Sequence, residues 1–488
     1  MAVGPLNDRQ LQKRIDAVLE VGRTSGDPFI QNGSNDPPLK LTFRFENSKT
    51  NDFPWDDVSS ISRLSKAEQD VVRDALKVYE RVINVKFVED KSGGDADISF
   101  FSADNMGSSA GGRARWRVNE SWDGFVVFRD APGIVTDASR FDFVLHEIGH
   151  ALGLKHPGDY DIGGNNPPGP FLDAREDNLK YTLMSYIDHP DDYADPTSLM
   201  IYDIAALQER WGANKDRAKG DNTYENSDIR KVEVVWDGGG KDTLRYDGRQ
   251  DAVIDLREGA FSSLGIKDNF AIAYGTRIER GTGDSGNDTI RGNDAKNVLK
   301  GAGGNDHLIG RDNDDRLEGG AGNDTLEGGR GDDRLEGGGG NDDLIGDKGR
   351  DRLEGGGGND TLIGNEGKDR LIGGTGRDRL KGGDGEDQFI FTTAKDSSAK
   401  RADADVIKGF SNGDRINVDR IDADTTRGGN QDFDFIRKRD FTGDAGEMRF
   451  SFRKGDTIVE VDRDGDRSVD FAIVIDDRVA LKESDFLL

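Results

Sequence analysis

A nine-residue repeat occupies residues 283–390 and constrains the fold more than any other feature of the sequence. Twelve consecutive units fit this segment, and each unit begins with glycine, from Gly283 to Gly382. The eighth position is apolar in all twelve units, from Ile290 to Phe389. The segment also holds 31 of the 66 glycines of the chain. A short, fixed period of this kind is typical of repeats that stack on their neighbours.

The sixth position of the repeat is aspartate in eleven units, and Asn297 is the exception. One unit offers a glycine-rich turn of six residues and a strand of three, so one side chain in nine reaches a core. Twelve such side chains cannot offset a backbone entropy of roughly 1–2 kcal/mol per residue, and acidic turns repel one another. Stacked turns would gather carboxylates and glycine carbonyls into oxygen cages, which suit Ca²⁺. We therefore expect structural calcium ions on Asp288, Asp306, Asp315, Asp324, Asp333, Asp342, Asp351, Asp360, Asp369, Asp378 and Asp387.

A flexible glycine-rich linker is the alternative for this segment. A linker requires neither the aspartates nor the apolar eighth position, so the pattern disfavours it. Gly319–Glu327 and Gly373–Lys381 match G-G-x-G-x-D-x-U-x in full, and this pattern resembles the calcium-binding nonapeptide of RTX proteins. The resemblance implies a parallel β-roll.

Composition excludes several classes of protein. The 488 residues include 95 acidic and 67 basic side chains, a net charge of −28, so we expect no nucleic-acid partner. The absence of cysteine excludes disulfide scaffolds, thiol nucleophiles and zinc sites built on cysteine. The first twenty residues lack the apolar run of a secretory signal, and no stretch approaches the roughly 18 apolar residues of a membrane span. We therefore expect no stable membrane insertion.

The chain divides by composition close to residue 215. Before this point, Leu39–Phe45 alternates as a strand, Ser65 begins a helix with a glutamate three residues later, and Phe141–Leu154 has the pattern of a second helix. After it, the sequence is polar and β-like. We therefore predict an α+β domain over 1–215 and an all-β domain over 216–488.

Three of the five histidines lie in the segment HEIGHALGLKH. His146 and His150 share one face of a helix, and both imidazoles can reach one Zn²⁺ at about 2.0–2.1 Å. Gly153 can leave the helix in the left-handed conformation and bring His156 back as a third ligand. Glu147 can address a water molecule in the open fourth position, as a catalytic zinc requires. Surface histidines are the alternative, which the extended H-E-x-x-H-x-x-G-x-x-H pattern disfavours.

The extended motif is similar to the signature of metzincins, in which a Met-turn follows. Here YTLMSY supplies Met184 and Tyr186. With the repeats and the HPG sequence at His156–Gly158, the chain resembles serralysins, secreted bacterial zinc endopeptidases, over nearly its whole length. The resemblance implies that the three histidines bind zinc, that Glu147 is the general base and that Met184 is an apolar floor. It also implies that Tyr186 is a switchable zinc ligand that stabilises the oxyanion, whereas its residue type alone predicts a core position.

Further acidic residues are candidates for calcium. The resemblance implies ligands at the junction with the β domain, namely Asp237, Gly239, Asp242 and Glu279. A second group forms either another calcium site or a solvated acidic loop, and it comprises Asp462, Asp464, Asp466 and Asp470.

The chain ends Asp485-Phe486-Leu487-Leu488, an acidic residue followed by apolar ones. This ending resembles the uncleaved signal of RTX proteins that are exported by type I transporters. A frayed tail is the alternative. The repeats and the missing N-terminal signal favour export.

Together these features imply a metzincin protease domain followed by a parallel β-roll and β-sandwich domain that binds calcium and carries the secretion signal region. We expect one catalytic zinc ion, several structural calcium ions, and an extracellular monomer that cleaves proteins or peptides. A type I transporter is the expected partner, and a proteinaceous inhibitor is a further candidate. The competing hypothesis is a calcium-dependent surface or binding protein with an inert protease domain. The intact Glu147 and three histidines argue against it.

Overall fold

A computed structural model describes most of the chain, in two compact units. The first unit comprises residues 1–222, 226–241 and 258–277, and the second comprises 223–225, 242–257 and 278–488. Because each unit is discontinuous in sequence, this division does not test the predicted domain boundary near residue 215, which stays a prediction. In the described part of the chain, no helix is both long and apolar enough to cross a membrane. The described residues are 6–19, 37–49, 54–56, 58–93, 96–106, 112–115, 124–129, 135, 141–158, 169–191, 196–225 and 232–488.

A six-stranded sheet lies at the centre of the first unit, in the order β3-β1-β4-β6-β5, with β2 paired to β4. Its strands are β1 (Leu39–Phe45), β2 (Ser59–Ser62), β3 (Val85–Glu89), β4 (Ile98–Asn105), β5 (Gly112–Arg115) and β6 (Gly124–Arg129). Strand β1 has the predicted bounds, and its alternation buries Leu41, Phe43 and Phe45. Strands β2 and β5 pair antiparallel, whereas the other pairs are parallel. Strand β5 forms an edge of the sheet.

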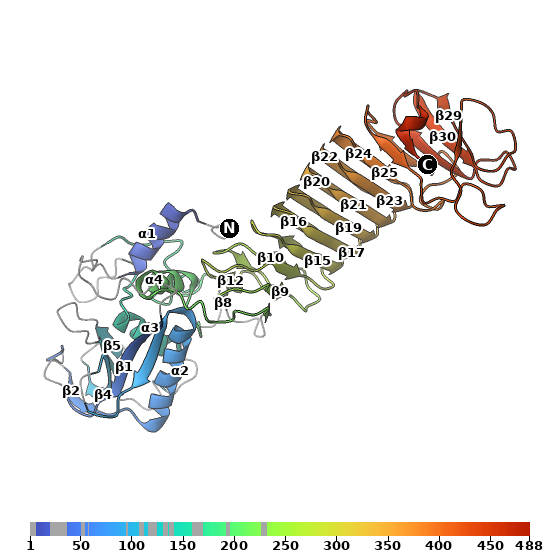
Figure 1. The fold of residues 1–488 in the computed structure, drawn as a ribbon. Coiled ribbons are helices and arrows are strands. Elements are labelled where there is room, and N and C mark those ends of the chain that lie inside the picture. Colours follow the sequence, from blue (N-terminus) through green and yellow to red (C-terminus); the bar gives the residue numbers. More distant parts are fainter. Residues whose placement is uncertain are drawn as a thin grey trace. The chain divides into compact units, whose positions relative to one another are not determined.

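Helices also belong to this unit (Figure 1). They are α1 (Asp8–Val18), α2 (Lys66–Val82), α3 (Phe141–Ala151) and α4 (Ile201–Trp211). Ser65 begins α2 as predicted, because its side chain and that of Glu68 each accept a hydrogen bond from the backbone N–H of the other residue. Helix α3 ends at Ala151 rather than at Leu154, because the chain turns at Gly153, where φ is 95°.

The unit also contains a small sheet in the order β11-β12-β8. Its strands are β8 (Glu233–Val235), β11 (Phe261–Ser262) and β12 (Phe270–Ile272). Ala271 and Ala273 belong to the same hydrophobic core as the helices, so the first unit extends beyond residue 215.

The repeats of the second unit form the predicted parallel β-roll, with alternate strands in two sheets (Figure 1). Leu317 pairs with Leu335, and Leu335 pairs with Leu353, so two nonapeptides form one coil of 18 residues. The strands of one sheet are β7 (Thr223–Tyr224), β9 (Thr243–Arg245), β13 (Arg280–Thr282), β15 (Val298–Gly303), β17 (Arg316–Ala321), β19 (Arg334–Gly339), β21 (Arg352–Gly357), β23 (Arg370–Thr375), β25 (Gln388–Ile390), β27 (Arg415–Asn417) and β32 (Phe486–Leu487). The strands of the other are β10 (Val253–Asp255), β14 (Thr289–Arg291), β16 (His307–Asp312), β18 (Thr325–Arg330), β20 (Asp343–Gly349), β22 (Thr361–Gly367), β24 (Arg379–Gly385), β26 (Asp405–Lys408), β28 (Asp434–Arg437), β29 (Glu447–Arg453), β30 (Asp456–Asp462) and β31 (Phe471–Ile475).

The strands from β15 to β24 are longer than the three residues predicted, at six or seven residues each. Strand β17 includes the first three positions of the next unit, and there Gly320 pairs with Gly338. The prediction was wrong because these positions continue the ladder instead of forming only a turn. The core prediction is confirmed, since the apolar side chains of the eighth position are all 0% exposed.

The chain ends in a strand. Strand β32 pairs in parallel with β27, and the backbone N–H of Val418 donates to the carbonyl of Leu487 at 2.9 Å. Phe486 is buried. Phe486 and Leu487 are therefore held in the sheet, and the frayed-tail alternative is wrong for them.

Candidate metal centre

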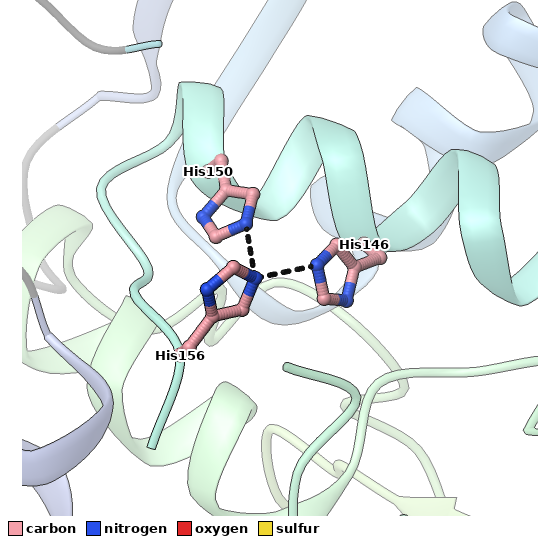
Figure 2. A group of neighbouring side chains, drawn as sticks. All are labelled: His146, His150 and His156. Atoms are coloured by element: carbon pink, nitrogen blue, oxygen red, sulfur yellow. Dashed lines mark hydrogen bonds between the residues drawn. The ribbon is translucent and has the colours of Figure 1, made fainter. Parts of the chain in front are cut away.

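Three imidazoles converge beside α3 (Figure 2). His146 and His150 project from the helix, and His156 returns from the segment after the turn. The Nε2 atom of His156 lies 3.2 Å from Nε2 of His146 and 3.0 Å from Nε2 of His150. A tetrahedral zinc ion with Zn–N distances of about 2.0–2.1 Å requires nitrogen separations of roughly 3.3 Å. The spacing of the three rings is therefore close to what zinc requires.

The other ring nitrogens decide where the protons lie. Nδ1 of His146 is 2.9 Å from the carbonyl oxygen of Leu183, and Nδ1 of His150 is 2.8 Å from that of Leu154. A carbonyl only accepts, so each Nδ1 carries a proton and each Nε2 presents a lone pair. The Nε2 of His156 can offer one proton at most to the two lone pairs. The cluster therefore fits a cation at the point where the three Nε2 atoms meet.

The histidines are held neutral, as metal ligands must be. Burial lowers the pKa of His146, and burial with its histidine neighbours lowers the pKa of His150 well below its ordinary value. The same causes lower the pKa of His156 to about 3. Neutral imidazoles without a thiolate are a donor set that suits zinc.

Glu147 lies next to His146 on α3 and is 6% exposed. Burial raises the pKa of Glu147 to about 8. The edge strand β5 approaches this carboxylate, since a Cβ atom on Gly112 would lie 3.0 Å from Oε1 of Glu147 and 2.6 Å from the ring of Phe143. A side chain at position 112 would collide with Phe143 and crowd Glu147, so glycine is needed here for β5 to approach α3 this closely.

The two Met-turn residues differ in burial. Met184 is fully buried, and its sulfur would lie 3.1 Å from a Cβ atom on Gly149, so it packs against α3. Tyr186 is 55% exposed, with its ring centroid 4.5 Å from that of His156 and 5.7 Å from that of His146. Tyr186 is therefore not a core residue, and it lies beside the histidines.

The aspartates of the repeat form two buried columns in the roll. Oδ1 of each aspartate from Asp306 to Asp387 accepts a backbone N–H from the residue 18 positions earlier, as in the 2.8 Å bond from Asp324 to Asp342. In the described part of the chain, their Oδ2 atoms are buried without a hydrogen-bond partner. Burial raises the pKa of several of them, to about 7 for Asp342 and Asp360. A row of buried carboxylate oxygens that lack donors fits a row of cations.

Glycine carbonyls complete these oxygen clusters. A Cβ atom on Gly319 would lie 2.4 Å from Oδ2 of Asp324 and 2.8 Å from the carbonyl oxygen of Gly337. Both oxygens therefore face the space that a side chain at position 319 would fill. Such oxygen clusters suit Ca²⁺.

Sequence analysis missed two members of the columns. Oδ1 of Asp405 accepts the N–H of Asp378 at 2.8 Å, and Oδ1 of Asp414 accepts that of Asp387 at 3.0 Å. Oδ2 of Asp405 is also buried without a partner within the described residues, and burial raises the pKa of Asp405 to about 9. Nine inserted residues hide this continuation from a search with a fixed period. The local signal is an aspartate two residues before a buried isoleucine, as in Asp405 and Ile407.

The four residues expected at the junction form two local pairs. Oδ1 of Asp237 accepts the N–H of Gly239 at 2.6 Å, and Oε2 of Glu279 accepts the N–H of Asp242 at 2.9 Å. The first pair belongs to the first unit and the second pair to the second unit. A calcium ion bound by all four stays a prediction.

The acidic loop after β30 keeps both of its interpretations. Ligand atoms of Asp462, Asp464 and Asp470 lie within 4.8 Å of one another. However, both oxygens of Asp462 already accept backbone N–H groups, from Gly465 and Arg467. These bonds hold the loop without an ion and leave room on each oxygen for a further partner, so both interpretations stay open.

Comparisons with known proteins show the relatives of this chain. The family model described as the C-terminal domain of M10 serralysin peptidases matches residues 210–488. The metalloprotease AprA of Pseudomonas entomophila is 32% identical over 306 residues, which cover 55% of this chain and 61% of that protein. The serralysin of Proteus mirabilis is 40% identical over 176 residues, which cover 32% of this chain and 36% of that protein. The serralysin of Photorhabdus luminescens is 32% identical over 316 residues, which cover 58% and 64%. The chain thus spans less than two thirds of the length of each of these relatives.

Proposed function

The chain belongs to the serralysin family of M10 peptidases, and from this premise we propose that it is a secreted zinc endopeptidase that hydrolyses peptide bonds of extracellular proteins. The observation that carries the proposal is the convergence of three neutral imidazole Nε2 atoms beside a buried glutamate. In this proposal the first unit is a metzincin protease domain. His146, His150 and His156 hold one zinc ion.

Zinc in this position supplies Lewis acidity, which polarises a peptide carbonyl and acidifies a water molecule. Glu147 lies on the same helix as two of the histidines and is buried, and the proposed role of its carboxylate is to take the proton from that water. The protonated Glu147 then passes the proton to the leaving amine. Burial raises the pKa of Glu147, which favours its hold on the proton between the two transfers.

Tyr186 is the proposed donor to the developing oxyanion. Its side chain is half exposed, and its ring lies next to His156. An exposed phenol can approach a substrate that lies over the histidines and donate its O–H to negative charge on the carbonyl oxygen. Tyr186 would also be a ligand for the zinc ion before substrate binds.

The edge strand β5 is the proposed binding strand for the substrate backbone. One side of β5 pairs with β6, and among the described residues its other side has no neighbouring strand. Gly112 of this strand lies next to Glu147, so a peptide added to the edge would run past the proposed base.

The proposed role of the second unit is calcium-dependent folding after export through a type I transporter. Its aspartate columns are the proposed calcium sites, and its terminal strand carries the proposed secretion signal region. Folding that requires millimolar calcium keeps such a chain unfolded where free calcium is scarce. An extracellular location follows from this proposal.

Hydrolysis of casein by the full chain in millimolar calcium tests the function. Addition of the zinc chelator 1,10-phenanthroline should abolish hydrolysis, and added zinc should restore it. The competing hypothesis of an inert binding protein expects no hydrolysis in either state. Hydrolysis that is insensitive to the chelator would also contradict the proposal.

A further inference from the structure

A buried carboxylate connects the Met-turn to α4. Asp203 is the third residue of α4 and is 0% exposed. Its Oδ1 accepts the hydroxyl of Thr182 at 2.6 Å, and its Oδ2 accepts the backbone N–H groups of Leu183 at 2.8 Å and Met200 at 2.9 Å. These three donors belong to two segments, the Met-turn and the start of α4, which also meet through the backbone hydrogen bond from Tyr202 to Tyr181.

The peptide between Leu183 and Met184 connects this carboxylate to a proposed zinc ligand. The carbonyl of that peptide accepts the Nδ1 proton of His146 at 2.9 Å, and its N–H donates to Oγ1 of Thr182 at 3.1 Å. The C=O and the N–H lie in one rigid plane, so a hydrogen bond that fixes one end also aims the other. The chain of contacts therefore runs from Asp203 through Thr182 and the peptide to His146.

The arrangement favours an ionised carboxylate. Three donors point at Asp203, and a carboxylate without a proton can accept all three at once. Asp203 lies in the first turn of α4, where the helix dipole favours negative charge. In the described residues, the hydrogen bonds of Asp203 go to Thr182, Leu183 and Met200, so its effect on His146 passes through the peptide.

We propose that Asp203 is a positioning residue for the metal centre, which fixes the tautomer and direction of His146 and the depth of Met184 through the Leu183–Met184 peptide. This inference rests on the proposed zinc function. Asp203 does not touch substrate or metal. Groups that orient a ligating histidine commonly contribute a factor of 10–100 to metal affinity.

Zinc affinity of the full chain, measured by competition with a chromogenic chelator in millimolar calcium, tests the proposal. Asp203→Ala should lower the affinity about 10–100-fold. Asp203→Asn should lower it less, because one amide oxygen can still accept the two N–H groups. Thr182→Val should also lower it, because the contact with Met184 N–H is lost. The absorption spectrum of the cobalt-loaded protein should change with the affinity, since it reports ligand geometry.

Asp97→Asn is the matched control. Asp97 likewise accepts a threonine hydroxyl and a backbone N–H, both from Thr42, at 2.7 Å and 2.5 Å, and within the described residues these two bonds connect β1 with the residue before β4 and not with the histidines. This variant should keep the zinc affinity and the cobalt spectrum of the unmodified chain, even if its melting temperature falls.

The outcomes separate the two proposals. The three variants are Asp203→Ala, Asp203→Asn and Thr182→Val. If all three melt at lower temperature but keep the zinc affinity and the cobalt spectrum, Asp203 is only a structural residue and the inference is wrong. If Asp203→Ala does not fold, Asp203→Asn and Thr182→Val decide in the same way. If the unmodified chain binds no zinc and cleaves no casein, the proposed function itself fails. If it cleaves casein, a failure of the variants concerns only Asp203.

Discussion

The histidine site and the aspartate columns differ in what they require before a metal arrives. His146 and His150 lie on a helix of a packed unit, and a backbone carbonyl fixes the second nitrogen of each ring. The aspartates lie in a stack with one apolar side chain per nine residues, and their Oδ2 atoms are buried without donors. The rings are neutral, whereas each aspartate adds a negative charge to a column. We therefore expect the zinc site to be shaped by the fold, and the roll to be shaped by calcium.

Removal of calcium should have the largest effect. It should unfold the roll and leave the unit with the histidine site folded. Residues 283–390 should lose most of their β structure, because calcium binds only the folded stack and extracellular sites of this kind typically have a Kd of about 10⁻⁴–10⁻³ M. Far-UV circular dichroism of the full chain during a calcium titration measures this change. The helical signal from α2 and α3 should remain. A β signal that is unchanged in excess chelator would contradict the calcium columns.

Replacement of Glu147 should separate catalysis from metal binding within the first unit. Glu147→Gln should lower peptide hydrolysis about 10²–10⁴-fold, since general-base contributions have this size. Zinc content should stay at the level of the unmodified chain, because Glu147 is not among the converging ligands. Hydrolysis rates are measured together with bound zinc. Normal turnover by the zinc-loaded variant would exclude the role of Glu147 as base.

Replacement of a proposed zinc ligand should remove the metal together with the activity. His156→Ala leaves two imidazoles, which form a poor site for a tetrahedral metal, so zinc should be lost on dialysis together with activity. Zinc stoichiometry after dialysis measures this loss. Full retention of zinc with normal activity would mean that the third ligand is another residue.

Acid should partly replace calcium in the roll. Burial raises the pKa of Asp342, Asp351 and Asp360 to about 7, above the value of an unfolded aspartate. The stability of the calcium-free roll is therefore fully present below about pH 4 and is lost as the pH rises through about 7. We expect the calcium-free chain to show more β signal at pH 5 than at pH 8. An equal signal at both values would contradict the claim that burial of ionised aspartates destabilises the calcium-free roll.

The smallest effect is expected at the one exception in the columns. The side-chain amide of Asn297 donates to the carbonyl of Glu279 at 3.3 Å and to the side chain of Asn293 at 3.2 Å. Asn297→Asp loses these bonds, each worth about 1 kcal/mol, and adds a carboxylate. We expect a slightly less stable calcium-free roll and one additional calcium ion per chain by isothermal titration calorimetry. An unchanged stoichiometry would show that the aspartate alone does not make a site.

Short-range patterns predicted much of both sites. The spacing of His146 and His150 on a helix, and the nine-residue period of the leucines and aspartates, need only local geometry. The contacts of Asp203 with the Met-turn could not be predicted in this way, because they depend on packing between segments about 20 residues apart. Asp405 was missed because an insertion breaks the period. The strand lengths were underestimated because glycine suggested turns, whereas parallel neighbours hold these glycines in the ladder.

Because one coil contains two nonapeptides, the effect of removing repeats depends on whether their number is even or odd. Removal of two nonapeptides would leave every later strand in its own sheet, because the pairing of Leu317 with Leu335 would be repeated one coil further on. Removal of a single nonapeptide would transfer every later strand to the opposite sheet. Strands β26 and β27, which follow Asp378 and Asp387 in separate columns, would then exchange sheets. Such rolls can therefore grow or shrink during evolution by whole coils, while the elements attached to their end keep the same orientation.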